Sequence, residues 1–285
     1  MKRTDINIRD PFVFPRDGKY YLYGTRGENF GRWTGGFDVY VSEDLENWSE
    51  PHECFDSAAY GMNTCCNWAP EVHEYKGAYY MLATFTNAET GMKGTHILRS
   101  ESLMGPFVPH SKGSVTPQEW EALDGTLYIS REGVPYMVFC HEHVQILDGT
   151  VCCVPLKEDL TCVDGEIVTL FHASEGRQVD PIDGEGKRFV TDGPFLHRTK
   201  AGELIMIWSS FIGGNYAVYP VRFAGGELGT DFSFLDPIVT ADGGHGMIFR
   251  AGDRLLLSLH SPNRSLSERP HFLELEENEN GISVK

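Results

Sequence analysis

The sequence predicts an all-β protein, folded over residues 1–285 as a single five-bladed β-propeller domain. Three observations support this fold. Five similar units begin at intervals of 53 to 68 residues, tight-turn dipeptides separate their strands, and no long helical periodicity competes with them. A large two-sheet β-sandwich is the alternative, but it would not explain why the five units share one register.

Each unit opens with a short apolar strand whose first residue is polar or small. These strands are predicted at 9–14, 68–73, 123–128, 191–196 and 244–249. A stronger strand follows each of them, at 18–25, 77–85, 133–140, 202–210 and 252–260. The dipeptides between the two strands, such as Asp17-Gly18 and Lys76-Gly77, suit tight hairpins.

A third strand completes the repeated pattern in every unit. The candidates are residues 37–42, 95–100, 149–156, 216–223 and 271–276. In a propeller the first strand of each blade lines the central axis, and the second runs antiparallel to it. The start of the first strand and the end of the second therefore lie on the same face of the disc.

Aligning the five first strands places one residue of each at the same end of the axis. We call them the axial residues: Asp10, Ala69, Asp124, Asp192 and His245. An aspartate before glycine can be explained as a turn cap, but three carboxyl groups at equivalent positions are costly where small apolar side chains would pack freely. Carboxyl groups that lie close together in a partly desolvated site acquire different pKa values. One of them can then serve as an ionised base and another as a protonated acid.

The ends of the second strands add polar and aromatic groups to this face. The candidate substrate-binding residues are Arg26, Trp68, Asn87, Glu142, Phe211 and Arg264, with Trp33 as a further aromatic platform. Aromatic faces beside hydrogen-bonding groups suit sugar rings, which have apolar C–H faces and polar edges. Core packing is the alternative role for Trp68, and a solvated surface position is the alternative for the two arginines.

Composition and charge narrow the classes of partner. The net charge of −17 disfavours nucleic acids and anionic membranes, because both need a basic surface. No run of 18 apolar residues is present, so no membrane span is predicted. The N-terminus lacks the apolar stretch of a signal peptide, and we expect a cytoplasmic protein or one whose signal was removed. Oligomeric state is not predicted.

Two other chemistries are disfavoured. The sequence has seven cysteines but no C-x-x-C pair, so we expect reduced, mostly buried thiols rather than a zinc site. His141 and His143 share one strand face, but no third metal ligand is evident. Cys140 and His141 are adjacent and point to opposite faces of a strand, which disfavours a thiol nucleophile.

The motifs, taken in order, resemble glycoside hydrolase family 43, a five-bladed propeller family. The resemblance covers essentially the whole chain and rests on segments at the starts of the five blades: Arg9-Asp10-Pro11, Trp68-Ala69-Pro70-Glu71-Val72, Leu123-Asp124-Gly125-Thr126, Asp192-Gly193-Pro194 and Gly243-Gly244-His245-Gly246. It implies inverting hydrolysis of arabinosides, xylosides or galactosides in plant polysaccharides.

Carried onto this sequence, the resemblance implies a role for each axial side chain. Asp10 matches the general base, and Asp124 matches the carboxyl group that tunes and orients the acid. Asp192 stands where the family usually has glutamate as general acid, one methylene longer, and Glu142 is the alternative acid. His245 matches an axial histidine that implies a Ca²⁺ ion held mainly by water.

We therefore expect a glycosidase that acts on arabinose- or xylose-containing oligosaccharides. A non-catalytic carbohydrate-binding propeller, with its acid position altered to Asp192, is the alternative from another class. A protein-interaction propeller is a third interpretation, but such scaffolds have no need of axial carboxyl groups.

Overall fold

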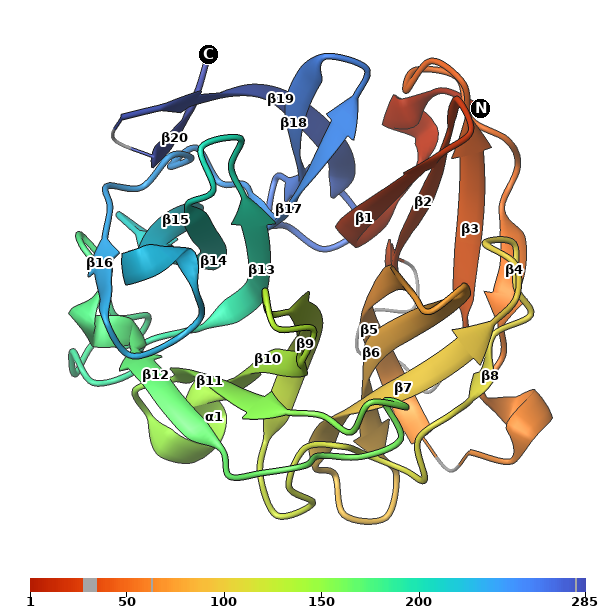
Figure 1. Cartoon of the computed structure of the whole chain (residues 1–285), viewed down its shortest axis with the longest axis horizontal. Helices are drawn as coiled ribbons and strands as arrows, with labels where there is room; N and C mark the ends of the chain where they lie inside the picture. Colours follow the sequence, from red (N-terminus) through yellow and green to blue (C-terminus); the bar gives the residue numbers. More distant parts are fainter. Residues whose placement is uncertain (28–34, 63, 280) are drawn as a thin grey trace.

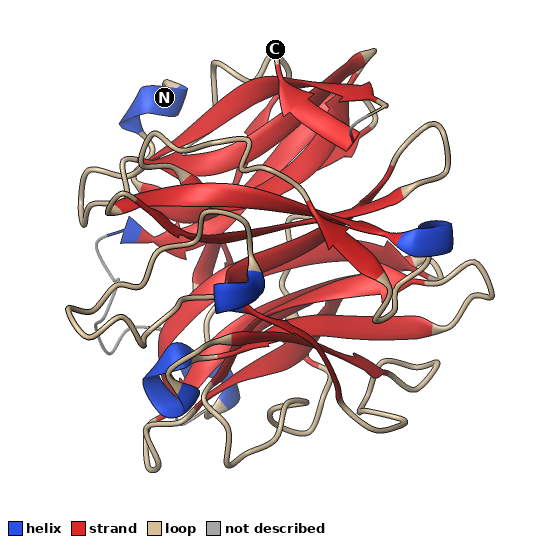
Figure 2. Ribbon diagram, turned by 90° about the vertical axis from the view of Figure 1, so that its left-hand side faces the viewer, coloured by secondary structure: helices blue, strands red, loops and turns tan. Residues whose placement is uncertain are grey.

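The computed structural model describes residues 1–27, 35–62, 64–279 and 281–285. It contains five four-stranded antiparallel sheets, each formed by four strands that are consecutive in the chain. The sheets stand around a common axis as the blades of a propeller (Figure 1), which confirms the predicted fold. Strands dominate the described chain, and the few helical segments are short and peripheral (Figure 2).

The strands occupy equivalent places in the five blades. The innermost strands are β1 (Ile8–Arg16), β5 (Thr64–Tyr75), β9 (Ala122–Ile129), β13 (Asp192–Arg198) and β17 (Gly244–Ala251). The second strands are β2 (Lys19–Arg26), β6 (Ala78–Asn87), β10 (Pro135–His141), β14 (Leu204–Ile212) and β18 (Arg254–Ser261). The third strands are β3 (Phe37–Ser42), β7 (Lys93–Ser100), β11 (Thr150–Pro155), β15 (Asn215–Phe223) and β19 (Arg269–Asn278). All three sets match the predicted segments.

The fourth strands were not predicted individually. They are β4 (His52–Phe55), β8 (Val108–Pro109), β12 (Val168–His172), β16 (Phe232–Phe234) and β20 (Gly281–Val284). These outer strands are short, and most lack the continuous apolar run that identifies a buried strand. The helical segments are α1 (His143–Ile146) and the 3₁₀ turns η1 (Arg3–Asp5), η3 (Ala58–Tyr60), η4 (Ala173–Glu175) and η5 (Ala224–Gly226).

The core lies between neighbouring blades, where the faces of adjacent sheets pack together. Large side chains fill it almost without exposure, including Tyr23, Phe37, Phe139 and Trp208. Four of the cysteines, Cys54, Cys140, Cys152 and Cys153, are buried as free thiols in these layers. No described helix is long and apolar enough to cross a membrane.

The ring closes between the first and last blades by side-chain contacts, because each of these blades is built from its own segment of chain. The Arg9 guanidinium lies 2.8 Å from the carboxylate of Glu268, and both groups are largely buried. The side-chain amide of Asn7 also donates to the Glu268 carbonyl. We call this contact between β1 and the β18–β19 segment the seam. It brings the segment that precedes β19 against the start of β1, beside Asp10.

Candidate active site

Every innermost strand carries a β-bulge near its start. At each bulge two residues of the inner strand lie opposite one residue of the second strand, as between Arg9 and Phe12 in β1. The first bulge residue has a left-handed backbone in all five blades: Asp10 (φ 53°), Ala69 (48°), Asp124 (57°), Gly193 (48°) and His245 (51°). For a residue other than glycine this conformation costs about 1–3 kcal/mol, so neighbouring contacts must hold it.

Hydrogen bonds between blades hold these bulges. In four blades the bulge N–H is bonded to a side chain on the second strand of the preceding blade: Ala69 to Thr25, Asp124 to Thr84, His245 to Ser209, and Asp10 to His260. In blade four the Gly193 N–H instead donates to the Asp124 carboxylate at 3.0 Å. This bond orients Asp124 toward blade four.

The bulge positions correct one detail of the sequence alignment. The blade-four residue equivalent to Asp10, Asp124 and His245 is Gly193, so Asp192 lies one position earlier. Asp192 pairs with Ser209, just as Arg9 pairs with Thr25 in blade one. The alignment missed this because Asp-Gly occurs in both blades three and four, although the bulge begins at the aspartate in one and at the glycine in the other. Gly193 also has a reason to lack a side chain, since a Cβ there would lie 2.8 Å from the His245 ring.

The bulges bring Asp10, His245 and Asp124 together at the axis. Nδ1 of His245 lies 3.2 Å from Oδ1 of Asp10 and 3.8 Å from Oδ2 of Asp124. The Thr25 hydroxyl donates to the other Asp10 oxygen at 2.6 Å. All three axial side chains are at least nine-tenths buried.

The surroundings of Asp10 favour its ionised form. Burial by itself would raise the pKa of this carboxyl group, but the His245 imidazole, the Arg9 guanidinium and the Thr25 hydrogen bond lower it below its usual value. Asp10 is therefore ready to act as a base.

The other two carboxyl groups are shifted in the opposite direction. Burial and then repulsion from Asp10 raise the pKa of Asp124 well above its usual range. Burial, followed by repulsion from Asp124, raises the pKa of Asp192 to about 7. The Tyr216 hydroxyl donates to Oδ2 of Asp192 at 3.0 Å. Asp192 can thus hold a proton near neutral pH while Asp10 does not.

Two predicted substrate-binding residues lie next to this cluster. Phe211 is the penultimate residue of β14, and its ring centroid is 5.3 Å from that of Tyr216, which contacts Asp192. Trp68 immediately precedes the Ala69 bulge and is partly exposed, with the Lys93 ammonium 5.7 Å from its ring.

Glu142 is occupied by an ion pair. Its carboxylate lies 2.9 Å from the Lys93 ammonium, which also contacts Glu121 at 3.2 Å. The side chain bounds the site from the blade-three edge, and its charge contributes to the raised pKa of Asp192. The lysine contact gives it less freedom than Asp192 to deliver a proton.

The remaining predicted binding residues have structural contacts. Arg26 pairs with Asp38 at 2.5 Å and Glu53 at 2.9 Å, so it joins strands within blade one. The side-chain amide oxygen of Asn87 accepts two backbone N–H groups of the following turn, those of Glu89 and Thr90. Arg264 is exposed in the β18–β19 loop. Trp33 lies outside the described residues.

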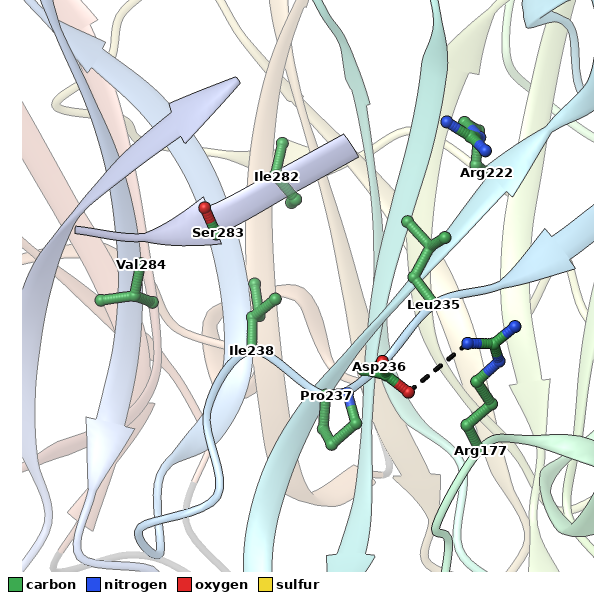
Figure 3. A pocket seen from close by; sticks show the side chains of 9 residues that line it. All are labelled: Arg177, Arg222, Leu235, Asp236, Pro237, Ile238, Ile282, Ser283 and Val284. Carbon is green, nitrogen blue, oxygen red and sulfur yellow. Dashed lines mark hydrogen bonds and ion pairs between the residues drawn. The ribbon is translucent and has the colours of Figure 1, made fainter. Parts of the chain in front are cut away.

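Two pockets of about 570 Å³ each lie away from the axial carboxyl groups. One of them is lined by residues of the β16–β17 connection and β20, with Arg177 and Arg222 at its edge (Figure 3). A smaller pocket of about 170 Å³ lies beside the end of β6 and includes Asn87 and Lys93. Chemistry, rather than size, therefore identifies the catalytic site.

The predicted Ca²⁺ ion does not fit a cage of protein ligands here. Among the described residues no group of three His, Cys, Asp or Glu side chains is arranged to hold a metal. Nδ1 of His245 already faces Asp10 and Asp124. A cation near His245 would depend mainly on water, and no catalytic step is derived through it.

Sequence reasoning missed Tyr216 as a site residue and the hydrogen-bonding role of Thr25 and His260. Thr25 and His260 lie at equivalent positions of their blades, because each pairs with the residue that precedes the bulge. Aligning the second strands of the five repeats could therefore have identified both. Tyr216 is the second residue of the third strand β15, and nothing in its local sequence points to the axis.

A five-bladed propeller that gathers carboxyl groups of oppositely shifted pKa around one axis is the architecture of a glycoside hydrolase. The sequence model for glycosyl hydrolases family 43 matches residues 5–254. The chain belongs to this family, and it is a glycosidase.

Solved structures agree with this assignment. The chain is 35% identical to the endo-arabinase from Bacteroides thetaiotaomicron VPI-5482, with a TM-score of 0.89 over 99% of this chain and 98% of that one. An α-L-arabinofuranosidase from Lactobacillus brevis is 18% identical (TM-score 0.77; 100% and 97% covered). A β-xylosidase/α-arabinofuranosidase from a compost microbial metagenome, with xylotriose bound, is 16% identical (TM-score 0.75; 100% and 96% covered). The last two support the fold alone. No curated protein matches the chain.

Proposed function

We propose that this chain is an inverting glycosidase that cleaves arabinose- or xylose-containing oligo- or polysaccharides, with Asp10 as general base and Asp192 as general acid. The observation that carries the proposal is the gathering of these carboxyl groups at one end of the axis, in surroundings that lower the pKa of Asp10 and raise that of Asp192. The similar endo-arabinase supports an arabinose-containing substrate, and xylose is the alternative sugar.

The proposed reaction follows from these protonation states. Asp10 takes a proton from a water molecule, whose oxygen attacks the anomeric carbon from the face opposite the leaving group. The glycosidic C–O bond breaks, and Asp192 gives its proton to the departing oxygen. The product sugar has the opposite anomeric configuration, Asp10 ends protonated and Asp192 ends ionised, and proton exchange with water restores both.

Asp124 assists without entering the bond changes. Its carboxyl group accepts the Gly193 N–H, so it fixes the backbone next to Asp192. Because two ionised carboxylates at this distance would repel each other, the presence of Asp124 contributes to the raised pKa of Asp192. Asp124 thus keeps the acid both protonated and oriented.

Turnover of nitrophenyl arabinofuranoside and xyloside and of arabino- and xylo-oligosaccharides tests the proposal, with proton NMR reporting the first anomer formed. We expect hydrolysis with inversion. Initial formation of the retained anomer would contradict the assigned roles. Binding of oligosaccharides without turnover would favour the carbohydrate-binding alternative.

A further inference from the structure

Tyr216 connects the acid to a neighbouring blade. It is the second residue of β15, and its side chain is 1% exposed. Its hydroxyl donates to Oδ2 of Asp192 at 3.0 Å. Because that oxygen is occupied, the other oxygen of the carboxyl group is the one available to a substrate.

The ring of Tyr216 also contacts the residue that supports the base. It stacks on His260 with centroids 5.6 Å apart and planes inclined by 26°. Burial lowers the pKa of His260 to about 3, so this imidazole is neutral. Its Nδ1 lies 3.1 Å from the Asp10 N–H and accepts it, which leaves Nε2 to carry the hydrogen and face Asn263 at 3.3 Å.

Gly244 makes room for this arrangement. A Cβ at this position would lie 2.5 Å from two carbons of the Tyr216 ring, far inside normal contact distance. Gly244 directly precedes the His245 bulge, and its backbone φ is not in the left-handed region. Its lack of a side chain is therefore explained by the ring rather than by backbone conformation.

We propose that Tyr216 is a positioning residue that holds the acid Asp192 through its hydroxyl and supports the backbone of the base Asp10 through its stack on His260. This inference rests on the proposed function. It joins three blades, since Tyr216 lies in blade four, His260 in blade five and Asp10 in blade one.

An aspartate acid has a particular need for such a contact. Its side chain is one methylene shorter than glutamate, and proton transfer requires heavy atoms within about 2.6–3.2 Å. A small rotation of the carboxyl group would remove it from the leaving oxygen. A fixed donor on one oxygen limits that rotation.

Tyr216→Phe is the central test, because it keeps the ring and removes only the hydroxyl. The groups that act on the charge of Asp192 are Asp124, His245, Glu142 and Tyr216. Since the Tyr216 bond favours the ionised form, its loss should move the basic limb of the kcat/KM profile up by about one pH unit. We expect kcat to fall roughly 10-fold on glycosides with poor leaving groups and less than about 3-fold on dinitrophenyl glycosides.

Tyr219→Phe is the matched control. Tyr219 lies on the same strand, and its hydroxyl donates to the carbonyls of Phe211 and Gln178 rather than to a carboxyl group. This variant should keep the wild-type pH profile and leaving-group dependence. If Tyr216→Phe behaves like this control, the proposal is overturned.

Gly244→Ala tests the position of the Tyr216 ring independently. It also keeps the proposal testable if Tyr216→Phe fails to fold. Its added Cβ displaces the ring, so both classes of substrate should lose about 10-fold or more in rate. Wild-type activity in folded Gly244→Ala would refute the positioning role. If the wild-type protein hydrolyses no glycoside, the proposed function is wrong. If the wild-type protein hydrolyses glycosides but the variants behave like the control, only this inference is wrong.

Discussion

The two ends of the catalytic site contain the same kind of residue in opposite surroundings. Asp10 lies at the seam, where imidazoles, a guanidinium and a hydroxyl group surround its carboxylate. Asp192 lies beside two further carboxyl groups, Asp124 and Glu142, with the Tyr216 hydroxyl as a hydrogen-bond donor. The neighbours, and not the residue type, decide which aspartate is the base and which is the acid.

The base and the acid also differ in which blades build their surroundings. The base side is built where the chain ends meet, and His260 and Glu268 from the last blade support Asp10 and Arg9 from the first. The acid side is built from neighbouring blades three and four, through the Asp124–Gly193 bond. Ring closure is thus a catalytic requirement on the base side.

Replacing the base should have the largest effect. Asp10→Asn is expected to fold but to lose at least about 10²-fold in rate on good and poor leaving groups alike, because water activation is needed for both. Steady-state rates on paired substrates measure this. Asp17→Asn, at an exposed carboxylate in the same hairpin, is the control and should be unaffected. Wild-type rates in Asp10→Asn would remove Asp10 from the mechanism.

Replacing the acid should slow the hydrolysis of substrates with poor leaving groups much more than that of substrates with good ones. Asp192→Asn is expected to lose about 10²-fold on natural glycosides, whose alcohols leave only when protonated, and to spare dinitrophenyl glycosides. The basic limb of the pH–rate profile should disappear. If Glu142 is the acid, this signature will appear in Glu142→Gln instead. Equal losses on both substrate types would make Asp192 a substrate-positioning residue.

Asp192→Asn should also change how the stability of the protein depends on pH, which tests the raised pKa of Asp192. The pKa of Asp192 is about 7 in the folded protein and about 3.9 in an unfolded chain, so stability declines as the pH rises from about 4 to 7. Asp192→Asn removes this ionisation cost, which is about 4 kcal/mol for a difference of about three pKa units, so it should be the more stable protein by that order at pH 8, with little difference at pH 4. Denaturant unfolding at both pH values measures it, and a pH-independent difference would contradict the assigned pKa.

The smallest effect is expected from chelation. If a water-held Ca²⁺ ion lies near His245, its removal takes a positive charge from the base side and should move the acidic limb upward by less than about one pH unit. Activity and melting temperature with and without EDTA, restored by added Ca²⁺, report this. No change in either quantity would count against the metal.

Much of the fold was predictable because blade strands repeat locally. Apolar runs, hairpin dipeptides and spacing located three strands in every blade. The fourth strands carried too little apolar pattern, and the blade-four alignment was off by one because Asp-Gly at 124–125 and at 192–193 differ only in where the bulge begins. Bulge register depends on pairing with the second strand, which local sequence does not express.

The sequence by itself determined the five-bladed architecture, the end of the axis where the carboxyl groups gather, and the family. Only the tertiary structure decided that the pKa of Asp10 is lowered and that of Asp192 raised, that Arg26 and Asn87 have structural contacts, and that Tyr216 touches the acid. Repeats and turns act over a few residues, so sequence reports them. Protonation and orientation depend on groups from other blades, such as His260, 250 residues from Asp10 along the chain, and folding alone brings these together.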